Sequence, residues 1–458
     1  MTVKVLVRSK RDADAVKASL EKFPETTHWT VKSLGGVRGG KLYDSILDEI
    51  EPFSIILLGW EDREIHEKIS QLTLRIPFTA SILARTKKVR NSTIEMINAL
   101  FSRARAIIRM RTLWNGTYVL SGWREGEPIE VPMEPYGDAF FLYGKGSMHA
   151  LKVLGLPEPD NGDAPILYAV KLAKGLHYIY SGNELIGEIY MNNHGLRPHG
   201  KSIKRNILVK KHLDVSELIN TNKPIIDILV KESKSYLQNI AHYDKKIVPL
   251  SGGKDSAAAL LLALEEFNRD EITAIYVDTG IDFDENRDYV INLTSKLNID
   301  LIIVEAGVDK GLLSGYPLPT PNNRWCTARK LAALKKAIER ISSGKRIALI
   351  VGDRDSESDR RSRRPLLRVD KGLPYPTIAP LRLWSAAHVM VFLWSRNIGV
   401  NPLYDYGFYR TGCYVCFSLR SWELSIMNEH GILDRIMNRK PHHETFIKRF
   451  LEEKSRDS

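Results

Sequence analysis

The chain has 458 residues, 43% of them hydrophobic and 27% charged, which is typical of a globular protein with two to four domains. Lys and Arg number 67 against 55 Asp and Glu, so the net charge is +12. This excess favours a polyanionic partner such as nucleic acid or a phosphorylated ligand, although a charged, heat-tolerant surface would give the same balance.

The compartment is indicated by apolar runs and cysteines. No apolar run approaches the roughly 20 residues that span a bilayer, so we expect no membrane helix. The first residues alternate like a strand and then become helical, which is not the pattern of a signal peptide. All three cysteines lie in the C-terminal third, which argues against a disulfide framework. We therefore expect a cytoplasmic protein.

The first half of the chain predicts three units. Residues 1–120 contain strand-like "VKVLVRS" and "FSIILLGW" and two amphipathic helical stretches, which predict a small α/β domain. Residues 121–205 contain short apolar runs separated by Gly, Asn, Pro and Asp, which predict a β-rich module of hairpins. Residues 206–243 predict a helical connector, interrupted near Pro224.

The second half alternates strands with helices. Residues 244–385 read strand–helix repeatedly, a pattern typical of an α/β fold whose parallel sheet is covered on both faces. We expect a nucleotide-binding domain here because "KIVPL" runs directly into a glycine-rich turn and a helix. Residues 386–458 form a C-terminal extension that carries Cys-x-x-Cys.

The turn between that strand and helix has the chemistry of an anion site. Gly252 and Gly253 allow close backbone approach to phosphate oxygens, and the first amides of the following helix carry partial positive charge. Lys254 adds a point charge, and Ser251, Asp255 and Ser256 can cap the helix or bind the ligand. A Walker A loop needs a glycine where Val248 stands, so this is a different phosphate cradle.

"SGGKDS" resembles the pyrophosphate loop of the PP-loop ATP pyrophosphatase superfamily, in which ATP is cleaved between its α- and β-phosphates. Four further segments are similar to the phosphoadenosine phosphosulfate (PAPS) reductase-like branch. They are "YVDTGIDFDENRDYV", "NNRWCTARKLAAL", "VGDRDSESDRRSRRP" and "NPLYDYGFYRTGCYVC". The resemblance implies an adenine-nucleotide α-hydrolase-like fold that binds ATP with Mg²⁺. The stretch ending "GEIYMNNHGLRPHGKSIKR" faintly resembles a PUA-type RNA-binding module.

The resemblance also implies roles for individual residues. The nucleotide would be bound by Ser251, Gly252, Gly253, Lys254, Asp255, Ser256, Asp278, Thr279 and Gly352. Lys254, Asp255 and Arg354 would be catalytic, with Arg354 contacting a phosphate or sulfate group. Asp278 would help to hold Mg²⁺. The arginines after residue 360 either pair with neighbouring acids, clamp a triphosphate or receive an RNA backbone.

The cysteines predict a metal site with alternatives. Cys326, Cys413 and Cys416 would leave one position of a tetrahedral site open. A [4Fe-4S] cluster with a free iron is the favoured interpretation, since pyrophosphatases that thiolate tRNA also use three cysteines. Zinc with a fourth ligand, a redox Cys-x-x-Cys pair and structural thiols remain alternatives.

Two basic stretches offer RNA contacts, or are solvated faces. The first has Arg103, Arg105, Arg109 and Arg111; the second has Arg197, Lys201, Lys204, Arg205, Lys210 and Lys211. Trp114 or Tyr190 could stack on bases. His442 and His443 are predicted to be surface residues.

These features favour an enzyme that adenylates a substrate oxygen and transfers sulfur to the carbon, with tRNA as the acceptor and an unidentified sulfur donor. Reductases of the family usually have a degenerate loop, whereas this chain keeps SGGKDS complete. The alternatives are a PAPS or adenylyl-sulfate reductase, a non-catalytic nucleotide- or RNA-binding protein, and a sulfate-adenylating transferase.

Overall fold

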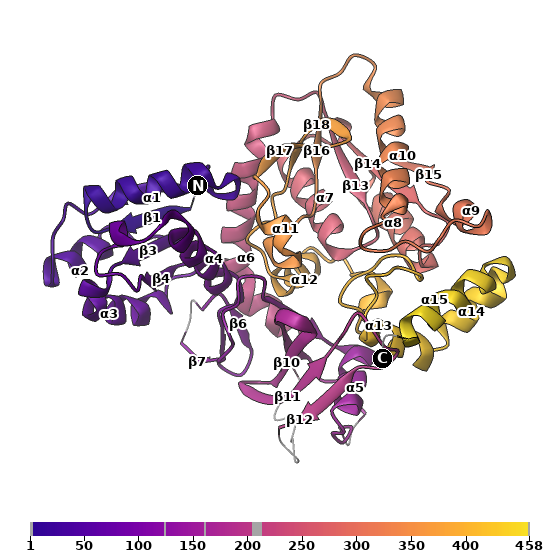
Figure 1. Ribbon diagram of the computed structural model, residues 1–458, viewed down its shortest axis with the longest axis horizontal. Helices are drawn as coiled ribbons and strands as arrows, with labels where there is room; N and C mark the ends of the chain where they lie inside the picture. Colours follow the sequence, from indigo (N-terminus) through magenta and orange to yellow (C-terminus); the bar gives the residue numbers. More distant parts are fainter. Residues whose placement is uncertain (1–2, 123–124, 160–161, 204–212, 457–458) are drawn as a thin grey trace.

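The computed structural model describes residues 3–122, 125–159, 162–203 and 213–456. Four β-sheets and the helices around them form three units that share one hydrophobic core (Figure 1). In the described part of the chain, no helix combines the length and apolar composition needed to cross a bilayer.

The N-terminal unit is a parallel α/β sheet of order β2-β1-β3-β4. Its elements are β1 (Lys4–Val7), α1 (Lys10–Lys22), β2 (Thr30–Ser33), α2 (Gly40–Leu47), β3 (Ser54–Leu58), α3 (Arg63–Thr73), β4 (Ala80–Leu83) and α4 (Ile94–Met110). The five residues of β3 are all buried, as expected for a central strand covered by helices on both faces.

The next unit is antiparallel. A small sheet contains β5 (Thr112–Trp114), β6 (Tyr118–Leu120) and β7 (Glu127–Pro128). A five-stranded sheet of order β12-β11-β10-β9-β8 contains β8 (Asp138–Leu142), β9 (Leu167–Lys171), β10 (Leu176–Ser181), β11 (Glu184–Tyr190) and β12 (His199–Ser202), with α5 (Gly144–Val153) after β8. The predicted hairpins are therefore present, and the likeness to a PUA module stays a prediction.

A single long helix, α6 (Val215–Leu237), leads into the second half. The predicted interruption near Pro224 is wrong, since the helix continues through it. The helix packs on α7, α12 and β6, and buried Asn222 binds the backbone of Tyr118 and Leu120. These contacts offset the hydrogen bond that proline removes.

The nucleotide-binding unit is built on a sheet of order β15-β14-β13-β16-β18-β17, in which only β17 is antiparallel. The strands are β13 (Lys245–Leu250), β14 (Ile272–Asp278), β15 (Leu301–Glu305), β16 (Ile347–Ile350), β17 (Leu367–Asp370) and β18 (Leu373–Ile378). The helices are α7 (Lys254–Glu266), α8 (Asp284–Leu297), α9 (Val308–Leu313), α10 (Trp325–Ser342) and α11 (Asp359–Ser362). The predicted α/β fold with a parallel sheet is confirmed.

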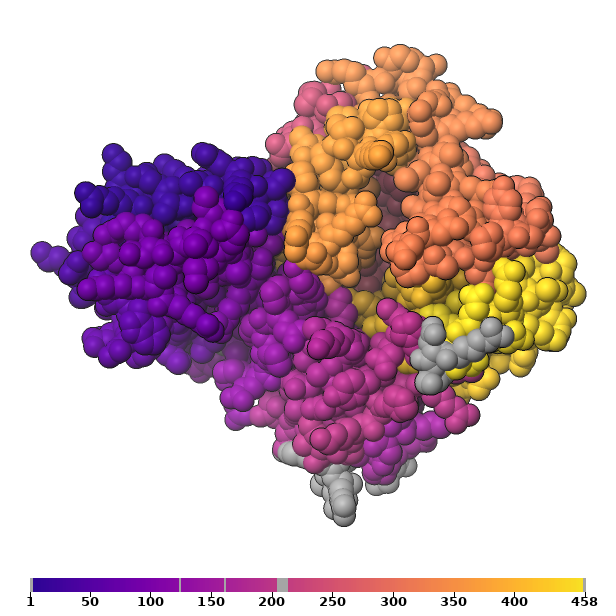
Figure 2. Space-filling view, in the orientation of Figure 1, coloured from indigo at the N-terminus to yellow at the C-terminus, as the bar shows by residue number. Residues whose placement is uncertain are grey.

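The last helices are α12 (Ala386–Ser395), α13 (Ser421–Glu429), α14 (Ile432–Arg439) and α15 (Glu444–Arg456). The first of these is almost wholly buried and packs on α6, α7 and β8, so it joins the β-rich and nucleotide-binding units. Figure 2 shows the N-terminal unit as a separate lobe and the surface hollowed between the other segments. The strand order reverses between β13 and β16, and ligands of such sheets bind at the carboxyl ends of the strands flanking this point.

Candidate functional site

The glycine-rich loop follows β13 at this reversal point. Gly252 has a φ of 77°, and a Cβ there would lie 2.8 Å from the backbone of Asn286, so only glycine fits. The residue that caps α7 is Gly253, without a side-chain hydrogen bond, so Ser251, Asp255 and Ser256 do not cap the helix, and their alternative role in binding the ligand stays a prediction. Ser256 instead braces the loop, donating from its Oγ to the Gly253 carbonyl (2.9 Å). The Lys254 amide donates to Tyr404 Oη (3.2 Å), so the following amides of the first turn of α7 are the ones available to an anion at the carboxyl end of the sheet.

Lys254 opens α7 and lies buried beneath two tyrosines. Its Nζ is 3.2 Å from Asp255 Oδ2 and lies over the rings of Tyr404 and Tyr409, at 5.0 and 5.4 Å from their centroids. Burial opposes the charge, but Asp255 together with smaller contributions from Tyr404 and Asp138 raises the pKa of Lys254. The lysine is therefore a fixed positive charge under the loop.

Arg354, which follows β16, is 1% exposed and joins the β-rich unit to the loop. Its Nε donates to Asp255 Oδ1 and its Nη1 to Asp138 Oδ2, each at 2.7 Å. Asp138 begins β8 in the β-rich unit and also accepts from Tyr409 and from the amide of Ala386. Burial opposes the ionisation of Asp138, but Arg354, Lys171 and the hydrogen bond from Tyr409 together hold the pKa of that carboxyl well below its usual range. The predicted catalytic arginine is thus the centre of a buried ion-pair network.

The neighbouring acids of the same loop complete this network. Asp355 is 2% exposed and binds Arg105 of α4 (2.9 Å) and Arg382 (2.7 Å). Lys171 of β9 donates to the Ser356 carbonyl (2.5 Å). The residues 353–358, which we call the hub loop, therefore contact both N-terminal units and the start of α7.

Gly352 precedes the hub loop and lies against α7. A Cβ at this position would be 2.5 Å from the carbonyl carbon and oxygen of Asp255. Backbone atoms cannot yield as a flexible side chain can, so this glycine sets the distance between the two loops.

The arginines after residue 360 are largely paired with acids of the same segment. Asp353 binds three of them and Asp359 binds Arg363; the three are Arg361, Arg364 and Arg368. Among the alternatives, the self-paired loop is the one that the geometry favours for these four side chains.

Asp278 and Thr279 end β14 and turn in different directions. Asp278 is half-buried and accepts from the Gly280 amide (2.8 Å). Thr279 is fully buried, and its Oγ1 is 3.6 Å from Cys413 Sγ. Its amide donates to Asp282, which forms a β-bridge with Cys413. The cysteine segment therefore lies against the end of β14, whereas binding of Mg²⁺ by Asp278 stays a prediction.

One ammonium group, that of Lys330, lies beside Cys413. Lys330 Nζ is 3.7 Å from Cys413 Sγ. Burial disfavours its charge, but Cys413, Asp282 and the other two thiols, Cys416 and Cys326, outweigh this and raise the pKa of Lys330. Burial and then Asp282 raise the pKa of the Cys413 thiol, which donates to Asp282 Oδ1 at 3.2 Å.

This arrangement does not fit the predicted metal centre. Within the described residues, no three Cys, His, Asp or Glu side chains form a group that could hold a metal ion. A metal ligand must be a thiolate, and Cys413 is a buried thiol that donates to a carboxylate. The structure therefore supports neither the iron–sulfur cluster nor zinc, and we derive no chemical step through either.

Three of the four arginines of the first basic stretch are buried, so neither of the two alternatives, RNA contact or a solvated face, holds for them. Arg105, Arg109 and Arg111 are 4%, 1% and 8% exposed. Arg109 donates to the Pro135 and Gly137 carbonyls, and Arg111 to those of Thr73 and Thr79. Of the second stretch, Arg197 and Lys201 are exposed, while Lys204, Arg205, Lys210 and Lys211 lie outside the described residues.

Histidine and tyrosine placements were also missed. His443 is buried and its Nδ1 is 2.6 Å from Tyr414 Oη, so its prediction as a surface residue is wrong, while His442 is exposed. Tyr404 and Tyr409 lie in the quoted motif at 401–416, which could have indicated them. Asp138 has no local signal, since its partner Arg354 lies 216 residues away.

Comparison with known proteins identifies relatives of the second half of the chain. Residues 245–419 match the sequence model of the phosphoadenosine phosphosulfate reductase domain. An uncharacterized protein of Methanocaldococcus jannaschii is 30% identical over 228 residues, which is 47% of this chain and 54% of that protein. The chain thus spans about half the length of this relative.

Two further proteins are similar over smaller shares. An adenosine 5'-phosphosulfate reductase of Rhodococcus erythropolis is 28% identical over 151 residues, or 32% of this chain and 59% of that protein. A solved phosphoadenylyl-sulfate reductase from Candida auris, in a phosphate complex, superposes with a TM-score of 0.34 at 18% identity over 42% of this chain and 95% of that chain.

The family match covers the strand–loop–helix, the hub loop and the cysteine segment together. Residues 245–419 are therefore a domain of the PAPS reductase-like branch of the PP-loop ATP pyrophosphatase superfamily.

Proposed function

We propose that the chain is an ATP pyrophosphatase that adenylates a carbonyl oxygen of an RNA base and transfers sulfur to the carbon. In the first step the oxygen attacks the α-phosphate of ATP, an O–P bond forms, and pyrophosphate leaves. In the second step a hydrosulfide-class donor from outside the chain attacks the carbon. The C–S bond forms, the C–O bond breaks, and AMP and a proton are released.

The observation that carries the proposal is the complete SGGKDS loop at the sheet's reversal point. The amides of the first turn of α7 that follow Lys254, together with the buried Lys254 side chain, are suited to a polyphosphate. A ready-made adenylyl sulfate needs no pyrophosphate cradle, so the intact loop favours cleavage of ATP.

The position of the cysteine segment is what favours sulfur as the transferred atom. Cys413 lies against Thr279 at the end of β14, beside the expected adenosine position. We propose that Cys413 and its two companions around Lys330 guide the incoming sulfur to the adenylated carbon. The tRNA acceptor is inferred from this chemistry together with the net charge of +12.

A reductase is the second candidate, because a relative named as an adenosine 5'-phosphosulfate reductase matches the same segment. It would reduce the sulfate of an adenylyl sulfate with thiol electrons, forming sulfite and a disulfide without ATP.

Pyrophosphate release from ATP, measured with and without unmodified tRNA, separates the two. We expect release that tRNA stimulates and that Lys254→Ala abolishes. Cys413→Ser should retain pyrophosphate release but lose thiolation of the RNA. Sulfite release from adenylyl sulfate in the absence of ATP, with no pyrophosphate formed from ATP, would overturn the proposal in favour of the reductase.

A further inference from the structure

The carboxyl edge of the N-terminal sheet forms one continuous rim of loops. Strands β1 to β4 are all parallel, so the segments that follow them meet at one edge. The Gly36 amide donates to the Arg8 carbonyl (2.8 Å), and the Trp60 amide donates to the Thr86 carbonyl (2.9 Å). Backbone hydrogen bonds therefore join neighbouring loops in pairs.

Every strand of this sheet is followed by exposed basic side chains. They are Lys10, Arg11, Arg38, Arg63, Arg85 and Lys87, which we call the basic rim. The nearby acids are mostly engaged within the protein: Glu61 and Asp62 bind the buried Arg8. Asp12 binds Arg90, and Glu64 is an exposed acid at the same edge. The outward charge of the rim is therefore positive.

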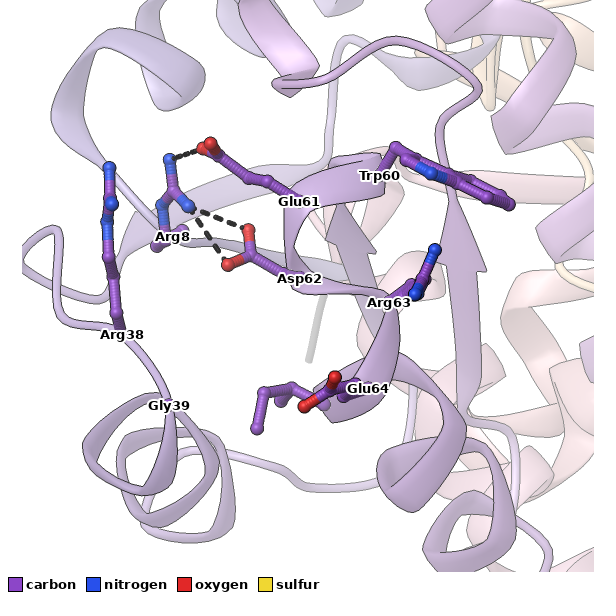
Figure 3. Close-up of a pocket in the computed structure, with 9 residues that line it drawn as sticks. Arg8, Arg38, Gly39, Trp60, Glu61, Asp62, Arg63 and Glu64 are labelled. Carbon is purple, nitrogen blue, oxygen red and sulfur yellow. Dashed lines mark hydrogen bonds and ion pairs between the residues drawn. The ribbon is translucent and has the colours of Figure 1, made fainter.

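An exposed indole lies in the middle of the basic rim. Trp60 is 50% exposed, and the guanidinium of Arg63 is 5.9 Å from its ring centroid. Figure 3 shows Trp60 and Arg63 on one side of a pocket of about 380 Å³, with Arg38 and Gly39 on the other. A Cβ built on Gly39 would meet no atom within 4 Å, so this side of the pocket is open.

We propose that the basic rim and Trp60 bind a single-stranded segment of the RNA substrate. Cationic side chains that follow a phosphate backbone around an exposed aromatic ring are the arrangement by which proteins bind single strands. The rim also provides the exposed basic surface that the buried Arg105, Arg109 and Arg111 do not. The inference rests on the proposed function, since it assigns the surface that holds the RNA acceptor.

The test measures binding of the full chain to a fluorescein-labelled, unmodified tRNA transcript over a range of salt concentrations. Arg38→Ala/Arg63→Ala/Arg85→Ala should weaken binding at least tenfold and lower the salt slope by about 2, because each phosphate contact contributes about 0.7–0.9. Trp60→Ala should weaken binding about tenfold with little change in slope, and Trp60→Phe should restore most of it.

The matched control removes three exposed basic residues elsewhere, Lys336→Ala/Arg340→Ala/Lys345→Ala. They lie on or after α10, across the molecule from α1–α3 (Figure 1), and should change affinity by less than twofold. Equal weakening by both triple variants would reduce the effect to net charge and overturn the inference.

The readouts separate this inference from the proposed function. If the rim variants bind tRNA as tightly as the wild type, and tRNA stimulates pyrophosphate release by the wild type, the inference about the basic rim is overturned and the proposed function is not. Rim-dependent tRNA binding without any pyrophosphate release supports the rim and overturns the proposed chemistry. Unchanged melting temperatures show that the variants are folded.

Discussion

Two glycine-rich loops in this molecule follow strands of parallel sheets, and their surroundings are opposite. The loop after β13 packs against Asn286, Tyr404 and the hub loop, and its lysine is buried. The loop after β2, with Gly35, Gly36 and Gly39, faces open space and carries the exposed Arg38.

The comparison teaches that glycine content alone does not define a nucleotide site. In the loop after β13, glycines are needed because other atoms occupy the space of a side chain. In the loop after β2, they are needed for backbone conformations with positive φ. The first loop is held by charges from three units, whereas charges of the second remain available to a partner.

The largest effect should come from breaking the buried ion pair between Arg354 of the hub loop and Asp138. In Asp138→Asn, Arg354 loses one of two anionic partners inside the protein, and breaking a buried pair typically costs about 3–5 kcal/mol. We expect a clearly lower melting temperature and loss of pyrophosphate release, although Asp138 lies outside residues 245–419.

The control for this variant is Asp359→Asn. Asp359 is half-exposed and binds the exposed Arg363, and surface pairs contribute about 0–1 kcal/mol. If Asp138→Asn had the same melting temperature and the same pyrophosphate release as Asp359→Asn, the hub loop would not couple the β-rich unit to the loop after β13.

The second effect concerns crowding at the loop after β13. In Gly352→Ala the new methyl group would overlap the Asp255 backbone, and such overpacking costs about 1–3 kcal/mol. The displaced start of α7 should weaken ATP binding, measured by calorimetry, more than it lowers the melting temperature. Normal ATP affinity in this variant would show that the distance between the two loops does not matter.

These contrasts also show what sequence could predict. The strand, the SGGKDS loop and the helix were predicted because their pattern is local and periodic. The burial of Arg109 and Arg111 was not, because their partners are backbone carbonyls brought near by folding. Asp138 was missed for the same reason, and Pro224 was misjudged because packing of α6 outweighs local preference.

The cysteines show an intermediate case. Cys413 lies beside Thr279 and Asp282, at the end of a strand whose residues the family motif indicated. The chemistry of the cysteines was not predictable, since Lys330 and Asp282 determine the protonation of Cys413 and neither spacing nor composition indicates this.

A third prediction concerns acid sensitivity near the hub. His388 is fully buried, accepts from the Ser385 amide (3.0 Å), and burial lowers its pKa to about 3. Below about pH 6.5 the unfolded chain therefore binds a proton at this histidine that the folded chain does not bind. As the pH is lowered from there, the free energy of unfolding falls by about 1.4 kcal/mol per pH unit.

In His388→Gln this proton is absent. Between pH 6 and pH 4 the unfolding free energy of the variant should fall less steeply than that of the wild type, by about one proton, in urea titrations. If the unfolding free energies of the two proteins changed with pH in parallel, the lowered pKa of His388 would be contradicted.

The smallest effect should come from the loop after β2. Gly36 has a φ of 79°, so Gly36→Ala should cost about 1 kcal/mol through backbone strain although the space is open. Gly40 begins α2 with an ordinary φ and open space, and Gly40→Ala should be neutral or slightly stabilising in the same thermal melts. Neither change should alter ATP-dependent pyrophosphate release, because this loop lies at the proposed RNA-binding edge and not beside the loop after β13. A loss of basal release in Gly36→Ala would mean that the two glycine-rich loops work as one site.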